Sequence, residues 1–100
     1  MILLSRFADG QLNSLVAHFE AKDRPEAVRN LIAAVARAAE RIANDRGNFF
    51  DAPRPYPGLT RPGWRWLKER SYWIAFAADG PDTEIRAIFH EAANIPARLP

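Results

Sequence analysis

The hydrophobic pattern of this chain changes its period half-way along, and no other feature constrains the fold as much. From residue 12 to residue 42 apolar side chains recur at helical spacing, and from residue 63 to residue 89 they alternate as in strands. The two parts are separated by residues 48–62, which hold four of the eight prolines. Proline lacks a backbone donor, so neither a helix nor a central strand can pass through this segment. Helices followed by strands predict an α+β fold.

Two helices are expected in the first half. The first carries the apolar residues Leu12, Leu15, Val16 and Phe19 and ends at residues 22–25. The second begins at Asp23, with Glu26 completing a capping box and Pro25 in the first turn, and Gly47 stops it. Its stripe consists of Val28, Leu31, Ile32, Val35, Ala38, Ala39 and Ile42. Because the connection is short, the two helices form an antiparallel hairpin.

Four strands are expected around this hairpin. Residues 2–7 form a short strand, and Asp9 and Gly10 interrupt the chain after it. Residues 63–68 and 72–77 form two strands joined by a tight turn, and residues 84–89 form the last, with Ile85, Ala87 and Phe89 on one face. Residues 78–82 form the turn before this strand, and residues 90–100 are expected to form one short helical turn that ends at Pro96. The predicted order is β-α-α-β-β-β.

The aromatic residues indicate one domain over residues 1–100 and two occupied sheet faces. Phe49, Phe50 and Tyr56 pin the proline-rich segment to the body of the protein. Trp64, Trp66 and Lys68 share one face of their strand, while Arg65 and Leu67 share the other. One face must cover the helices. The tryptophans either pack in a core or remain exposed as anchors for a partner.

Composition excludes several classes of protein. Cysteine is absent, so disulfides and thiolate zinc sites are excluded, and no apolar run approaches the roughly 20 residues that span a bilayer. The N-terminal apolar run is too short for a signal peptide, so a cytoplasmic protein is expected. His18 and His90 lack metal-ligand spacing, and no nucleotide-binding loop or nucleophile elbow occurs. We therefore expect no metal, no cofactor and no catalytic residues.

The stretch PGLTRPGWRWLKERSYWIAF, with EIRAIFHEAANIPARL after it, resembles the RelE/ParE superfamily of toxins from bacterial type II toxin–antitoxin modules. The resemblance spans nearly the whole chain. It is closer to the ParE branch, in which a histidine ends the last strand as His90 does here. It implies the RelE/ParE-like fold, with a helical hairpin packed on a mostly antiparallel sheet.

The two branches of the superfamily imply different activities. RelE-like members cleave mRNA on the ribosome with basic residues on the central strands and a C-terminal arginine and tyrosine. The matching strand positions here are Trp64, Trp66 and Trp73, and no tyrosine follows His90, so ribonuclease activity is not expected. ParE-like members bind DNA gyrase without catalytic residues. This chain departs from their usual arginine and aspartate after the histidine, with Ala92 and Asn94.

The resemblance also implies two contact surfaces. Residues expected to contact the target are Arg61, Trp64, Arg65, Trp66, Lys68, His90 and Arg98. A ParD-like antitoxin, with a ribbon-helix-helix domain and a disordered C-terminal segment, would fold across Leu15, Phe19, Val28, Leu31, Val35 and Trp73. The alternatives are a ribosome-dependent endoribonuclease, a nucleic-acid-binding module that stacks bases on Trp64 or Trp66, and a toxin homologue that is inactive or has another target. The net charge of +2 is weak support for a polyanionic partner, although five basic residues against one acid make residues 54–70 locally cationic.

Overall fold

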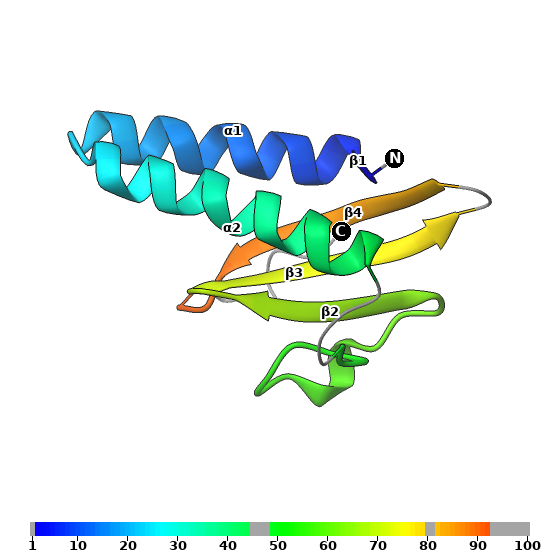
Figure 1. Ribbon diagram of the computed structural model, residues 1–100. Helices are drawn as coiled ribbons and strands as arrows, with labels where there is room; N and C mark the ends of the chain where they lie inside the picture. The colour runs from blue at the N-terminus through cyan, green and yellow to red at the C-terminus, as the bar shows by residue number, and fades with distance from the viewer. Residues whose placement is uncertain (1, 45–48, 80–81, 93–100) are drawn as a thin grey trace.

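The computed structural model describes residues 2–44, 49–79 and 82–92. The elements, in chain order, are β1 (Ile2–Leu4), α1 (Arg6–Ala21), α2 (Pro25–Ala43), a 3-10 turn (Pro57–Leu59), β2 (Trp64–Glu69), β3 (Tyr72–Asp79) and β4 (Asp82–His90). The helices lie over one face of a four-stranded sheet with the order β1-β4-β3-β2 (Figure 1). β1 is parallel to β4, and the other pairs are antiparallel. The predicted α+β order and helical hairpin are confirmed, and neither helix is long and apolar enough to cross a membrane.

Helix α1 begins earlier than the sequence pattern indicated. The predicted strand over residues 2–7 stops at Leu4, because Ser5 caps the helix and its Oγ accepts a hydrogen bond from the Ala8 N–H at 3.1 Å. The same hydroxyl donates to the carbonyl of Arg86 at 3.2 Å, which ties the cap to β4. Asp9 and Gly10 therefore lie inside the helix and not in a turn. Gly10 is exposed there, and a glycine inside a helix costs about 1 kcal/mol relative to alanine.

Helix α2 starts without the predicted capping box. Arg24 is the N-cap and makes no side-chain cap bond, while Asp23 lies in the preceding turn with a φ of 53°. Glu26 instead pairs with Arg24 Nε at 3.2 Å. Leu31 and Ala38 of the predicted stripe are fully buried, but Ile32 is 51% exposed, so its place in the stripe was wrong. The predicted stop at Gly47 lies outside the described residues.

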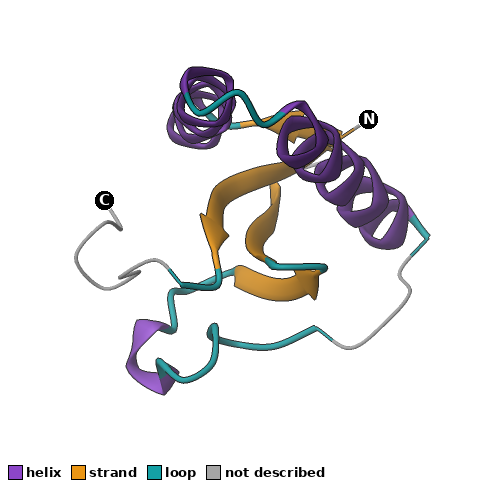
Figure 2. Ribbon diagram, turned by 90° about the vertical axis from the view of Figure 1, so that its left-hand side faces the viewer, coloured by secondary structure: helices purple, strands orange, loops and turns teal. Residues whose placement is uncertain are grey.

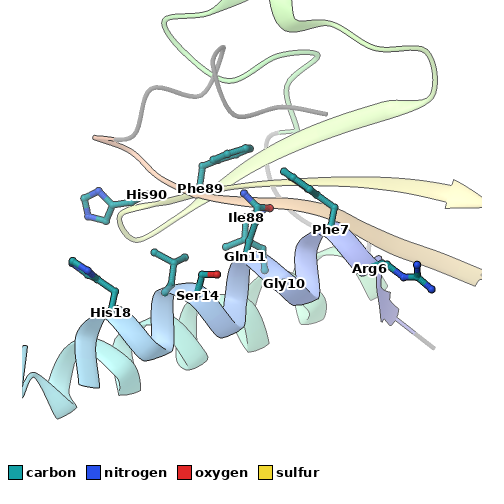
Figure 3. A pocket seen from close by; sticks show the side chains of 10 residues that line it. Arg6, Phe7, Gly10, Gln11, Ser14, His18, Ile88, Phe89 and His90 are labelled. Carbon is teal, nitrogen blue, oxygen red and sulfur yellow. The ribbon is translucent and has the colours of Figure 1, made fainter. Parts of the chain in front are cut away.

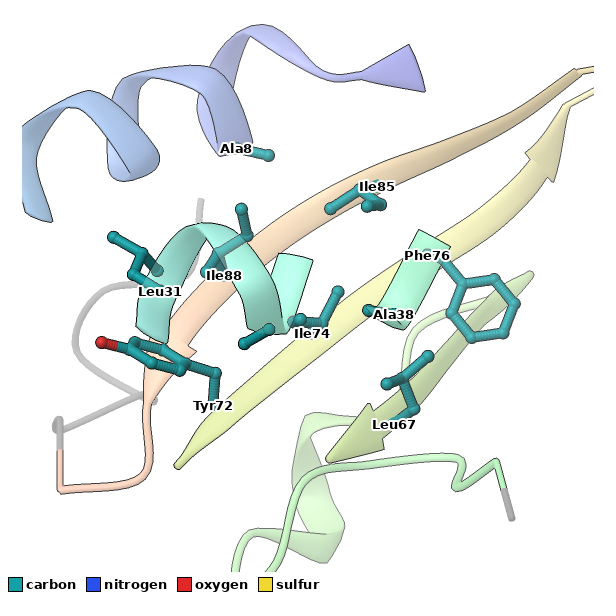
Figure 4. Close-up of a cluster of buried hydrophobic side chains, with 10 residues drawn as sticks. Ala8, Leu31, Ala38, Leu67, Tyr72, Ile74, Phe76, Ile85 and Ile88 are labelled. Carbon is teal, nitrogen blue, oxygen red and sulfur yellow. The ribbon is translucent and has the colours of Figure 1, made fainter. Parts of the chain in front are cut away.

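A β-bulge in β4 changes which side chains face the helices. Ala75 of β3 pairs with Ala87, but Phe76 pairs with Ile85, which leaves Arg86 as the extra residue. Ile85 therefore turns to the helix side, where Figure 4 shows it in the cluster with Leu31, Ile74 and Ile88. Ala87 and Phe89 face the opposite side. The prediction that Ile85, Ala87 and Phe89 share a face was wrong, because period-two counting cannot detect a bulge.

The face of the sheet away from the helices carries a second core. It contains Trp66, Trp73, Ala75, Ala87 and Phe89. The segment before β2 covers this face, as Figure 2 shows with the 3-10 turn on the side opposite the helices. Phe50 fixes it there, because its N–H and carbonyl exchange two 2.7 Å hydrogen bonds with the backbone of Trp66. The rings of Phe50 and Tyr56 pack against the second core and Phe49 packs against the helix-side core, which confirms that aromatic residues pin the proline-rich segment.

The remaining boundaries differ slightly from the predictions. β3 extends to Asp79 and β4 begins at Asp82, and these two residues pair, so the connection between them is shorter than the predicted turn over residues 78–82. The predicted helical turn after His90 falls mainly on residues 93–100, outside the described residues.

Candidate partner-binding groove

A groove of about 810 Å³ runs between α1 and β4 (Figure 3). The described residues that line it are Arg6, Phe7, Gly10, Gln11, Ser14, Leu15, His18, Ile88, Phe89 and His90. Its volume lies within the range typical of ligand-binding clefts, about 300–1,000 Å³. It is therefore a candidate binding site.

The groove exists because β1 is short. Ile2–Leu4 pairs only with residues 83–85, so from Arg86 to His90 the outer edge of β4 has no neighbouring strand among the described residues. Side chains satisfy part of this edge instead. Gln11 Oε1 accepts a hydrogen bond from the Ile88 N–H at 2.7 Å, and Ser5 Oγ donates to the Arg86 carbonyl at 3.2 Å. The edge is thus held by two side chains of the α1 segment and not by a strand.

The groove combines an apolar floor with basic and neutral polar groups. Phe7 and Phe89, with ring centroids 6.3 Å apart, lie beside Leu15 and Ile88. The ionisable side chains of the described lining are Arg6, His18 and His90, and no carboxylate is among them. Such a surface complements an amphipathic peptide segment that carries acidic residues.

Sequence reasoning identified only part of this groove. Leu15 and His90 were named as contact residues, whereas Arg6, Phe7, Gln11 and Ser14 were missed. A signal was available, because Gln11, Ser14 and His18 follow one another at helical spacing on a single face of α1. Arg6 and Phe7 were missed for a different reason. The prediction placed them in a strand over residues 2–7, whereas they belong to α1.

The residues expected to bind an antitoxin are distributed over several environments. Leu15 lines the groove, and Phe19 lines a smaller pocket beyond its end. Val28 and Val35 are half-buried on α2. Leu31 is 0% exposed and Trp73 only 5% exposed, because they belong to the helix-side core and the second core respectively. Neither presents a surface to a partner in this structure, so these two candidates are corrected to core residues.

The residues expected to contact the target are also separated by the sheet. Trp66 is fully buried in the second core, so it presents no surface to the target that it was expected to contact. Trp64 is half-buried on the same face, with the Arg61 guanidinium 5.1 Å from its ring centroid. Arg65 is exposed on the helix side, 5.9 Å from the Phe49 ring.

Two further target candidates, Lys68 and His90, lie near the end of β4. Lys68 forms an exposed ion pair with Glu91, and this bond holds the pKa of the Glu91 carboxyl below its usual value. His90 packs edge-on against Tyr72 and its Nδ1 accepts a hydrogen bond from the Ala92 N–H at 3.1 Å. Arg98 lies outside the described residues. The structure therefore brings Arg61 and Trp64 together, places Arg65 on the opposite face of β2, and pairs Lys68 with Glu91 beside His90.

The second core fills the face where the resemblance placed the RelE-type catalytic positions. Trp64, Trp66 and Trp73 occupy it, packed with Phe50 and Phe89 at centroid distances of 5.7 to 6.4 Å. Indole rings do not titrate near neutral pH and cannot exchange protons with a substrate. Within the described part of the chain, no group of three His, Cys, Asp or Glu residues could hold a metal ion.

Comparison with known proteins finds similarity to solved structures. No protein-family model and no curated protein matches the sequence. Among solved structures, the chain is similar to one described as the chromosomal ParDE TA system from P. aeruginosa, with a TM-score of 0.64 and 17% sequence identity. The match covers 89% of this chain and 92% of that chain. The backbone agreement extends over nearly all of both chains, so this protein has the RelE/ParE-like fold that its sequence resemblance implied.

Proposed function

We propose that this chain is the toxin of a type II toxin–antitoxin module, a single ParE-like domain that inhibits DNA gyrase by protein–protein binding. A cognate ParD-like antitoxin neutralises it. The observation that carries the proposal is the backbone match to a ParDE structure over 89% of this chain. Gyrase acts on DNA in the cytoplasm, so the proposal places the toxin there.

The groove between α1 and β4 supports an antitoxin partner. It offers apolar contacts from Phe7, Leu15 and Phe89, and basic groups with no described carboxylate among them. A disordered acidic segment can gain enough buried apolar surface there to offset the entropy lost when it orders. Partner backbone can also pair with the β4 edge that Gln11 now satisfies.

The exposed aromatic and basic residues support a target bound by contact. Arg61 and Trp64 form an adjacent pair of the residue types that dominate interface energies. The buried Trp66 packs against Trp64, with ring centroids 6.2 Å apart. Ala92, which stands where family members commonly carry arginine, is exposed beside His90, so the proposed target contacts depend on Arg61 and Trp64.

A gyrase supercoiling and DNA-cleavage assay tests the proposal. Purified protein should abolish supercoiling or trap cleaved DNA, and co-purified product of the neighbouring antitoxin reading frame should reverse the effect. Replacing Arg61 by Gln and Trp64 by Ala should weaken inhibition at least tenfold. Arg37→Gln removes the same charge from an exposed position on α2 and serves as the matched control.

Other outcomes would redirect the assignment. Undisturbed gyrase at high protein excess would exclude it as the direct target. Cleavage of mRNA in a ribosome-containing translation reaction would favour the endoribonuclease. Antitoxin binding without either effect would identify a non-toxic or retargeted homologue.

A further inference from the structure

We propose that a second pocket at the end of the groove binds a carboxylate of the antitoxin segment. This contact fixes the position of the segment along α1. The pocket has a volume of about 340 Å³. Its polar lining comes from Arg24, Asn30, Arg70, Ser71, Tyr72 and His90. The inference rests on the proposed function, because it assigns a subsite within the same partner-binding surface.

Two turns from distant parts of the chain build this pocket. Arg24 follows the turn between α1 and α2, and Arg70 lies in the turn between β2 and β3. Among the described residues, the two non-glycine residues with positive φ are Asp23 at 53° and Arg70 at 56°, one in each turn. Left-handed backbone at such residues is unfavourable and persists only where the surrounding structure enforces it. The fold thereby holds two guanidinium groups at the same pocket.

The polar groups of the pocket can donate hydrogen bonds, and two of them have no acceptor among the described residues. Arg70 and Asn30 make no side-chain hydrogen bond or ion pair with any part of the protein that the structure describes. Arg24 pairs with Glu26 through Nε alone, in a bond whose partners are both more than half exposed. Burial raises the pKa of Tyr72, so its hydroxyl stays protonated and able to donate. The described lining includes no carboxylate, so the pocket is complementary to an oxyanion.

Continuity with the groove favours a peptide carboxylate as this oxyanion. His90 lines both cavities, so a segment that follows α1 from Arg6 towards His18 arrives at the second pocket. The apolar residues on the way, Leu15 and Ile88 in the groove and Phe19 in the pocket, suit amphipathic peptide better than a phosphate backbone. A guanidinium group binds a carboxylate through two parallel hydrogen bonds, which would fix the register of the segment.

The first test uses the complete chain and simple anions. In nitrogen–proton NMR spectra, N-acetylglutamate should shift the Nε–Hε signals of Arg24 and Arg70 in a saturable manner. Arg70→Gln should abolish the shift at Arg24, while Arg37→Gln should leave it unchanged. If the signals do not move, or move equally in both variants, the carboxylate site is refuted. A response to inorganic phosphate alone, with competition by an oligonucleotide, would also refute it and assign the pocket to nucleic acid.

The second test measures antitoxin affinity by titration calorimetry with the product of the neighbouring antitoxin reading frame. Arg70→Gln and Arg24→Gln should each weaken binding about tenfold, whereas Arg37→Gln should change it less than twofold. One Asp or Glu of the antitoxin, changed to its amide, should cause a similar loss that is not additive with Arg70→Gln. Unchanged melting temperatures would exclude misfolding, and using two arginine variants guards against failure of either one.

The outcomes separate this inference from the proposed function. Normal antitoxin binding by both arginine variants would overturn the carboxylate subsite and leave the toxin assignment intact. Weakened antitoxin binding in a protein that does not affect gyrase would support the subsite and remove gyrase from the proposal.

Discussion

Replacement of Trp66 by phenylalanine should leave stability almost unchanged, although Trp66 is fully buried. Its ring stacks against Phe89 with centroids 6.4 Å apart and lies 6.2 Å from the Trp64 centroid. Its indole Nε1–H is buried and has no hydrogen-bond partner among the residues that the structure describes. A buried donor without a partner costs about 1–3 kcal/mol, and the substitution removes that cost.

The substitution also lowers the free energy of unfolding, by a similar amount, through the cavity that it leaves and the apolar surface that it removes. Phenylalanine leaves about 40 Å³ empty, which at about 24 cal/mol per Å³ costs about 1 kcal/mol. The apolar area lost, about 30 Å², costs about 0.8 kcal/mol more. We therefore expect Trp66→Phe to change the free energy of unfolding by less than about 1 kcal/mol, whereas Trp66→Ala should cost about 3–5 kcal/mol.

Urea denaturation monitored by circular dichroism measures these differences. Trp73→Phe is the matched control, because Trp73 is only 5% exposed in the same core. Unlike Trp66, it is not among the residues whose buried polar atoms lack a partner in the described structure. It should lose about 2 kcal/mol, since only the cavity and burial terms apply. If Trp66→Phe costs as much as Trp73→Phe, the Trp66 indole has an acceptor in solution and the reasoning is wrong.

Three further predictions concern the α1–β4 region and the alkaline limit of stability. Ser5→Ala should lower the free energy of unfolding by about 1–2 kcal/mol, because the helix cap is lost. Ser5→Thr should retain most of that free energy, because threonine also caps helices. Equal losses for the two variants in urea titrations would argue against capping. Gln11→Ala should selectively accelerate hydrogen exchange at the Ile88 amide and lower the free energy of unfolding by about 1 kcal/mol. Unchanged protection of the Ile88 amide would show that another group accepts its hydrogen bond. Burial raises the pKa of Tyr72 above its ordinary value of about 10. The folded state therefore holds the Tyr72 proton more tightly than the unfolded state does. The free energy of unfolding that Tyr72 contributes is complete below the pKa of the unfolded state and is lost as pH rises through the raised pKa of the folded state. Tyr72→Phe should therefore flatten the alkaline part of a stability–pH profile, and an unchanged slope would contradict the assignment.

Elements with strong local signals were predictable from sequence. The switch from helical to alternating periodicity gave the order of helices and strands, since a helix and a strand expose one apolar face at different spacings. The division of Trp66 and Leu67 between opposite faces followed from the same rule. The likeness of the strand motifs to RelE/ParE toxins identified the fold, and the similar solved structure confirmed it.

The errors in the prediction occur where long-range contacts decide the local conformation. Ser5 caps α1 partly because its hydroxyl also reaches Arg86, 81 positions away in the sequence. The bulge at Arg86 depends on register with β3, so the position of Ile85 could not follow from alternation within its own strand. Glu26 forms no capping box with Asp23, because Asp23 lies in the turn before α2 with a left-handed backbone.

The sequence alone determined the periodic elements, their order and the likeness to a toxin fold, because those depend on neighbouring residues. Only the tertiary structure decided which aromatic residues remain exposed and where a groove opens on the surface. Burial of Trp66 and Trp73 requires the segment from Phe50 to Leu59 to fold over the sheet. The groove and its end pocket require the short β1 strand, α1 and two distant turns to come together. Such sites form between elements, so no single stretch of sequence encodes them.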